Sequence, residues 1–114
     1  MRPRKTPALA ARVIRTAMIW AARKGAACLL TPEMILTGYH AGFNQGERDS
    51  AIRDILAPAC RETGMTLFLG TGNKIAPFGR SYPRPRMELL ILGPRGKPLG
   101  AHHKVLLAGS DNGV

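Results

Sequence analysis

The chain has 114 residues, of which 45% are hydrophobic, and seventeen basic against seven acidic residues give it a net charge of +10. This length suits one small domain, and the apolar fraction is ordinary for a globular protein, so we expect a packed core and exclude wholesale disorder. No apolar run reaches the roughly eighteen residues that a membrane-spanning helix needs.

The excess of positive charge raises the question of nucleic acid or an anionic membrane, because clustered Lys and Arg attract phosphate. Seven basic residues lie in residues 1–24 and seven more in residues 74–104, without a spaced series of aromatic residues to stack on bases. We therefore expect neither a nucleic acid nor a membrane as a partner. A basic binding module, for nucleic acid or a protein partner, stays open as the alternative function.

The N-terminus superficially resembles a targeting signal, because the basic residues 1–5 precede an apolar stretch. Arg12 and Arg15 interrupt that stretch, which excludes a secretory signal. The composition also matches a mitochondrial presequence, but a surface helix on a basic protein gives the same pattern, and we favour the helix. We expect a cytoplasmic protein in which Cys28 and Cys60 are reduced and buried.

A first helix is predicted over residues 7–24, because apolar residues recur there at helical spacing. Thr6 is suited to cap this helix, Pro7 to begin it and Gly25 to end it. The expected apolar stripe consists of Ala10, Val13, Ile14, Ala17 and Ala21. Residues 26–30 follow as an unbroken apolar run, which predicts a strand covered on both faces, as in a parallel sheet.

The middle of the chain predicts a loop over residues 37–48 and a second helix over residues 50–63. Asp49 or Ser50 is the expected cap of this helix, and Pro58 is expected to kink it. Gly64 ends the helix, and the next buried strand is predicted over residues 65–69.

The last third predicts a long loop over residues 70–86, with Gly70-Thr-Gly72 in a turn. Two strands follow, over residues 87–92 and 99–103, joined by a turn at Gly93–Gly96. Helices alternating with strands predict an α/β layer. No strand precedes the first helix, so the sheet is expected to begin one strand short.

Glu33 and Lys104 are the candidate site residues, since each lies at the carboxyl end of a predicted strand. Ligands bind at that end of the strands in open α/β sheets. A glutamate and a lysine at one such edge are able to act as proton acceptor and charge stabiliser. A turn carboxylate and a surface lysine in solvent would give the same pattern. His102 and His103 are adjacent on a strand, so they should point to opposite faces and cannot chelate a metal together.

Three stretches carry motifs in a fixed order. Residues 21–39 contain Gly-Ala, an apolar run, Pro-Glu and Thr-Gly-Tyr; residues 52–70 contain a helical pattern, Glu-Thr-Gly and a strand; residues 89–107 contain a hairpin that leads into His-Lys-Val-Leu-Leu. Together they resemble the nitrilase superfamily of carbon–nitrogen hydrolases. The resemblance implies an α/β fold, namely an incomplete nitrilase-like α-β-β-α sandwich half that lacks the first strand and the C-terminal half. Residues 1–114 would form this single incomplete domain.

The resemblance also implies a Glu–Lys–Cys hydrolase of non-peptide carbon–nitrogen bonds that uses no cofactor or metal. Glu33 would be the general base, Lys104 would stabilise the oxyanion, and a cysteine would form an acyl-enzyme. No cysteine follows Lys104 in the sequence, and Cys28 and Cys60 lie within a predicted strand and helix. We therefore expect the chain to be inactive as given.

Two further expectations concern substrate and assembly. Residues 37–44 resemble the amidase-like members of the superfamily, which implies an aliphatic amide as substrate. The missing strands would leave sheet edges and an apolar face uncovered, so a homo-oligomer or aggregate is expected. Residues 81–86 differ from the family, which usually shows an Asn after a Tyr there.

Overall fold

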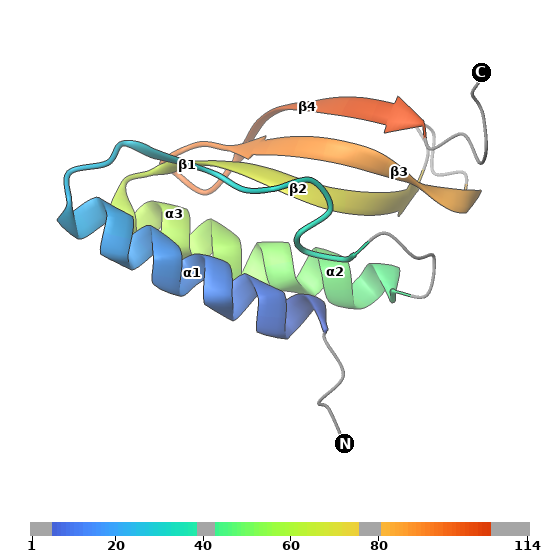
Figure 1. Ribbon diagram of the computed structural model, residues 1–114, viewed down its shortest axis with the longest axis horizontal. Coiled ribbons are helices and arrows are strands. Elements are labelled where there is room, and N and C mark those ends of the chain that lie inside the picture. The colour runs from blue at the N-terminus through green and yellow to red at the C-terminus, as the bar shows by residue number, and fades with distance from the viewer. Residues whose placement is uncertain (1–5, 39–42, 76–80, 106–114) are drawn as a thin grey trace.

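The computed structural model describes residues 6–38, 43–75 and 81–105; for residues 75, 81–85, 104 and 105 it describes the backbone alone. These residues form two layers, with helices covering one face of a four-stranded sheet (Figure 1). The α/β prediction is confirmed. In chain order the elements are α1 (Pro7–Arg23), β1 (Cys28–Leu30), α2 (Gln45–Ala51), the π-helical segment η1 (Ile52–Leu56), α3 (Ala57–Thr63), β2 (Thr66–Ile75), β3 (Ser81–Leu92) and β4 (Pro98–Val105).

The sheet has the order β1-β2-β3-β4, with β1 parallel to β2 and the other neighbours antiparallel. β3 and β4 form the predicted hairpin, and Gly96 in its turn has a φ of 78°, which favours glycine. The expectation for β1 is wrong: Cys28 and Leu30 are exposed, so this strand is not covered on both faces and Cys28 is not buried. The cause is that, within the part of the chain that the structure describes, β1 is an edge strand of three residues and pairs with β2 alone.

The first helix is predicted almost to the residue. The Thr6 side chain accepts a hydrogen bond from Leu9 N at 3.2 Å, and Gly25 follows the helix with a φ of 87°. The expected stripe is partly wrong, because Val13 is 70% exposed. The face of α1 that packs on the core is rotated about the helix axis relative to the predicted stripe, and it consists of Pro7, Ala11, Ile14 and Met18.

The second helical stretch begins earlier than predicted, at Gln45, because Asn44 caps it by accepting a hydrogen bond from Glu47 N at 2.9 Å. The end of the predicted loop over residues 37–48 is therefore wrong. Pro58 does not kink one continuous α-helix as expected. It lies in the first turn of α3, directly after η1, where its missing N–H is accommodated by the change in hydrogen-bond spacing.

The predicted loop over residues 70–86 is wrong. β2 continues through Gly70 and Gly72, and β3 begins at Ser81, so most of this segment is strand. One irregularity of pairing lies between Asn73 and Ile75. The core lies between the sheet and the helices and comprises Ala11, Ile14, Met18, Leu36, Ala51, Leu56, Ala59, Cys60, Met65, Leu67, Leu69 and Leu92.

Candidate functional site

The turn that follows β1 is bound along its length to the neighbouring strand β2. Thr31 donates from N and from Oγ1 to Phe68 O, at 3.0 and 3.1 Å, and its Oγ1 accepts from Gly70 N at 2.8 Å. Leu36 N then donates to Gly70 O at 3.2 Å. The backbone on both sides of Glu33 is therefore fixed against the sheet.

Two glycines of β2 make this close approach possible. A Cβ on Gly70 would lie 2.2 Å from Pro32 O, and one on Gly72 would lie 2.8 Å from Thr37 Oγ1. Gly72 N also donates to Thr37 Oγ1 at 2.7 Å. The Gly-Thr-Gly motif is thus neither a phosphate loop nor the expected turn. It is a strand segment whose missing side chains let the Glu33 turn lie flat on it.

Met34, directly after Glu33, has a φ of 56°. This left-handed conformation costs a residue with a Cβ roughly 1 kcal/mol or more. The Met34 side chain is only 2% exposed, so its packing holds the strained turn in place. Glu33 itself is exposed, at the outside of this anchored turn.

A hollow of about 530 Å³ opens beside the turn. Its lining consists of Leu30, Thr31, Pro32, Glu33, Met34, Gly70, Met87, Glu88, Leu89 and His102. Its polar lining residues are Thr31, Glu33, Glu88 and His102, and the remaining lining residues are apolar or glycine. Lys104 pairs with Met87 through the backbone of β4, and its side chain lies outside the described part of the structure.

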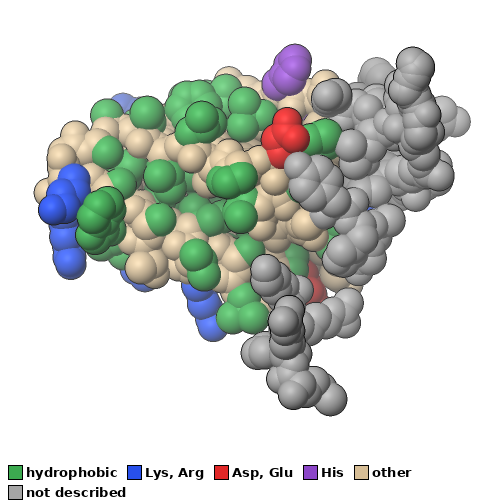
Figure 2. Space-filling view, in the orientation of Figure 1, with side chains coloured by type: hydrophobic (Ala, Val, Ile, Leu, Met, Phe, Trp, Pro, Cys, Tyr) green, Lys and Arg blue, Asp and Glu red, His purple; other side chains and the backbone are tan. Residues whose placement is uncertain are grey.

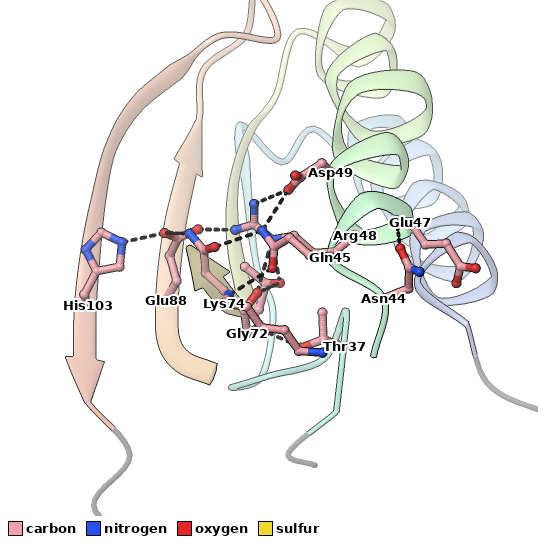
Figure 3. A network of polar contacts seen from close by, with 12 residues as sticks. Thr37, Asn44, Gln45, Glu47, Arg48, Asp49, Gly72, Lys74, Glu88 and His103 are labelled. Carbon is pink, nitrogen blue, oxygen red and sulfur yellow. Dashed lines mark hydrogen bonds and ion pairs between the residues drawn. The ribbon is translucent and has the colours of Figure 1, made fainter. Parts of the chain in front are cut away.

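A buried polar network lies next to the hollow, between α2 and the sheet (Figure 3). Arg48 of α2 forms an ion pair with Glu88 of β3, and their side chains are 9% and 5% exposed. Arg48 Nε also donates to Gly72 O at 3.1 Å. The other oxygen of the Glu88 carboxylate accepts from Asn73 Nδ2 at 3.0 Å and lies 2.5 Å from His103 Nε2. The network thus joins α2, β2, β3 and β4.

A second set of contacts holds the start of α2 against β2. Gln45 donates to Asn73 Oδ1 at 2.9 Å and accepts from Lys74 N at 2.9 Å. The Lys74 ammonium donates to Phe43 O and lies 4.4 Å from the centre of the Phe43 ring. These contacts fix the segment that precedes Arg48.

The charge of Glu88 is stabilised by its partners. Burial raises the pKa of this carboxyl, but the Asn73 hydrogen bond, the Arg48 charge and His103 outweigh it, so the pKa lies below its ordinary value. His103 contacts the carboxylate of Glu88, which is paired with Arg48 on the helical side of the sheet, whereas His102 lines the hollow beside the Glu33 turn. The two histidines therefore point to opposite faces of β4, as predicted.

The sequence patterns did not predict that Arg48 and Glu88 form a buried ion pair beside the candidate site. Arg48 fell in a predicted loop, and its contacts with the sheet span 24 and 40 residues of sequence. One signal was present: Glu88 is a single carboxylate within the apolar stretch Met87–Leu92. Such a charge on a strand that packs against helices requires a buried partner.

Two absences hold for the described residues. None of their His, Cys, Asp and Glu side chains forms a group of three or more that could hold a metal ion. No helix in residues 6–38 or 43–75 is long and apolar enough to cross a membrane.

The carbon–nitrogen hydrolase family model matches residues 4–112. The chain belongs to the carbon–nitrogen hydrolase family. A search of the curated proteins found no match.

Solved amidases share the fold of this carbon–nitrogen hydrolase chain. The NitN amidase from Nesterenkonia sp. AN1 is 23% identical, with a TM-score of 0.74 over 92% of this chain and 41% of that one. A double mutant of the AN1 amidase in complex with acrylamide is 23% identical, with a TM-score of 0.75 over 96% and 41%. An amidase from Nesterenkonia sp. is 24% identical, with a TM-score of 0.75 over the same shares. The likeness confirms a partial nitrilase-like fold, and the chain spans about two fifths of these relatives, 41% of their length.

Proposed function

We propose that this chain supplies the base and the oxyanion-stabilising lysine of a carbon–nitrogen hydrolase site, with Glu33 and Lys104 in these roles. The observation that carries the proposal is the hollow at the end of β1. Glu33 and Met87 both line it, and Met87 is the strand partner of Lys104. The two candidates therefore belong to segments that border one concave surface, as a shared site requires.

The proposed chemistry divides between the two residues and a thiol. The Glu33 carboxylate takes the proton of the nucleophilic cysteine, whose sulfur then attacks the amide carbon. The lysine ammonium stabilises the oxyanion of the tetrahedral intermediate. Ammonia leaves, and water hydrolyses the resulting thioester.

Neither cysteine of the sequence suits the nucleophile role. Cys28 is exposed on the edge strand and Cys60 is fully buried in the helical layer, and neither lines the hollow. Burial also raises the pKa of the Cys60 thiol, which keeps it protonated. The 114-residue chain is therefore proposed to be inactive by itself.

The proposed substrate is an aliphatic amide. Leu30, Met34 and Leu89 give the hollow apolar walls that suit a short hydrocarbon chain, and Glu33 offers an acceptor for the amide N–H groups. A double mutant of the AN1 amidase has been solved in complex with acrylamide, and another mutant carries the acetamide moiety of fluoroacetamide at the active site cysteine. Both compounds are small amides.

Domain organisation and compartment belong to the same proposal. The described elements pack around one core, which supports a single domain over residues 1–114. Its coverage of 41% of the NitN amidase chain supports the interpretation that this domain is incomplete. Cytoplasm is the proposed compartment, on the composition of the sequence alone.

Two measurements test the function. Propionamide, added to the 15N-labelled protein, should shift the backbone amide resonances of Thr31, Glu33 and Met34 and of residues 87–89, all of which line the hollow. The same protein should release no ammonia from propionamide. Ammonia release that is lost in Glu33→Gln would show that the chain has a nucleophile of its own and would contradict the proposed inactivity.

A further inference from the structure

The helix α1 has two apolar faces, and only one of them is covered. Ala11, Ile14 and Met18 are buried against the core. With about 3.6 residues per turn, Leu9, Val13 and Trp20 fall on the opposite side of the helix. They are 44%, 70% and 63% exposed. Figure 1 shows no described element on this outer side of α1, so the second face has no partner within the described residues.

Cations flank this outer face, which we define by Leu9, Val13 and Trp20. Arg12 and Arg23 are exposed along one border. On the other border, the Lys24 ammonium lies 5.4 Å from the centre of the Trp20 ring.

The surroundings contain little negative charge. The first 32 residues contain seven basic residues and neither Asp nor Glu. Glu62 of α3 lies near α1 and pairs with Arg15 at 3.4 Å. The outer face thus combines apolar side chains with a strongly positive border.

We propose that the outer face of α1 docks on the surface of a bilayer that contains anionic lipids. Tryptophan prefers the boundary between lipid and water, and Arg and Lys beside an apolar stripe reach toward the phosphates. A narrow convex ridge suits shallow insertion into a deformable surface. A second copy of the chain fits less well, because it would bring two acid-free basic faces together. The sequence predicted no membrane partner. The proposal departs from that prediction, but docking on the bilayer surface does not require a helix that spans the membrane.

Trp20 provides the test, because it is the single tryptophan of the sequence and its emission therefore reports on the outer face. Vesicles of phosphatidylcholine mixed with phosphatidylglycerol should shift the emission to shorter wavelength. Vesicles of phosphatidylcholine alone should not, and salt should reverse the shift. An unchanged emission at about 50 mM salt, where the attraction is strong, overturns the proposal.

Matched variants separate docking from general attraction of a basic protein. Arg12→Gln with Arg23→Gln should weaken vesicle binding by about thirtyfold, from roughly 1 kcal/mol per cation near the surface. Arg95→Gln with Lys97→Gln removes two exposed cations from the β3–β4 turn, where a Cβ on Gly96 would lie 2.6 Å from Ala57 O of α3. Because this turn packs on α3 and not on the outer face of α1, vesicle binding should weaken less than threefold. Equal losses in the two variants overturn the proposal.

The apolar side chains and the partner class have their own controls. Val13→Ser should weaken vesicle binding and Leu99→Ser, on the sheet, should not, although both side chains are about two-thirds exposed, 70% and 67%. Poly-glutamate should leave the Trp20 emission unchanged. An equal blue shift with poly-glutamate would assign the outer face to an acidic polypeptide and overturn the lipid proposal.

Discussion

Arg48 on α2 and Glu88 on β3 form an ion pair that is buried between the helical layer and the sheet. Each partner is held by further hydrogen bonds: Arg48 donates to Gly72 O, and Glu88 accepts from Asn73. The pair therefore ties the strand next to the Glu33 turn to the strands that lead to Lys104. Figure 2 shows the apolar side chains spread over the face turned to the viewer, whereas this pair lies in the interior.

Removing one partner of this pair should be costly. Arg48→Met leaves the Glu88 charge buried, and we expect the free energy of unfolding to fall by about 3 kcal/mol. Chemical denaturation measures this free energy of unfolding. Arg15→Gln breaks an exposed ion pair and should leave the value nearly unchanged. A double variant, Arg48→Met with Glu88→Leu, should lose less than the single Arg48 variant. If the double variant loses more stability than the single variant, the unpaired buried charge of Glu88 is not the cause of the loss.

Stability should also depend on the protonation of Glu88. The pKa of its carboxyl is lower in the folded protein than the ordinary 4.5, so its contribution is present above about that pH and is lost as pH falls through the folded pKa. We expect the free energy of unfolding to decrease from about pH 4.5 downward. Glu88→Gln should flatten this part of the profile. An identical acid profile in that variant would exclude Glu88 as the source.

The Glu33 turn should depend on the missing side chain of Gly70. Gly70→Ala would place a Cβ 2.2 Å from Pro32 O, so the turn must move. We expect a loss of about 2–4 kcal/mol in unfolding free energy, as for overpacked interiors. Gly100→Ala is the matched control, because nothing lies within 4 Å of its Cβ. It should be neutral or slightly stabilising. Equal effects of the two changes would mean that the contact with Pro32 does not matter.

Local signals in the sequence predicted the fold best. Thr6, Pro7 and Gly25 each act within a few residues of α1, so its bounds could be predicted from the chain itself. The same holds for the turn at Gly93–Gly96, where Gly93 N donates to Lys97 O at 2.9 Å.

Contacts between distant residues could not be predicted in this way. The glycines of β2 favour a loop by composition, but they extend the strand because the Thr31–Thr37 segment packs on them. The exposure of β1 likewise depends on which strands flank it, not on its own apolar residues. Glu33 was predicted at a strand end and lies there, whereas Arg48 and Glu88 are joined only by the tertiary fold.

The two cysteines should differ sharply toward thiol reagents. Cys28 is exposed, whereas Cys60 is buried and its thiol pKa is raised by that burial. We expect one thiol to react within seconds of adding an aromatic disulfide reagent, and the second only on unfolding. Cys28→Ser should abolish the rapid phase. A rapid phase that persists in this variant would contradict the buried position of Cys60.

We propose that Glu33 and Lys104 border one amide-binding hollow, and the affinity for an amide tests this directly. The dissociation constant for propionamide should rise about tenfold in Glu33→Ala and in Lys104→Ala, because each removes a charge-assisted contact of roughly 1.5 kcal/mol. Glu62→Ala in α3 and Lys97→Ala in the β3–β4 turn alter exposed residues that do not line the hollow, and should leave the dissociation constant unchanged. We predict that Glu33→Ala and Lys104→Ala weaken the affinity for propionamide by similar factors and that the two control variants do not. Unchanged affinity in either Glu33→Ala or Lys104→Ala would contradict the shared site.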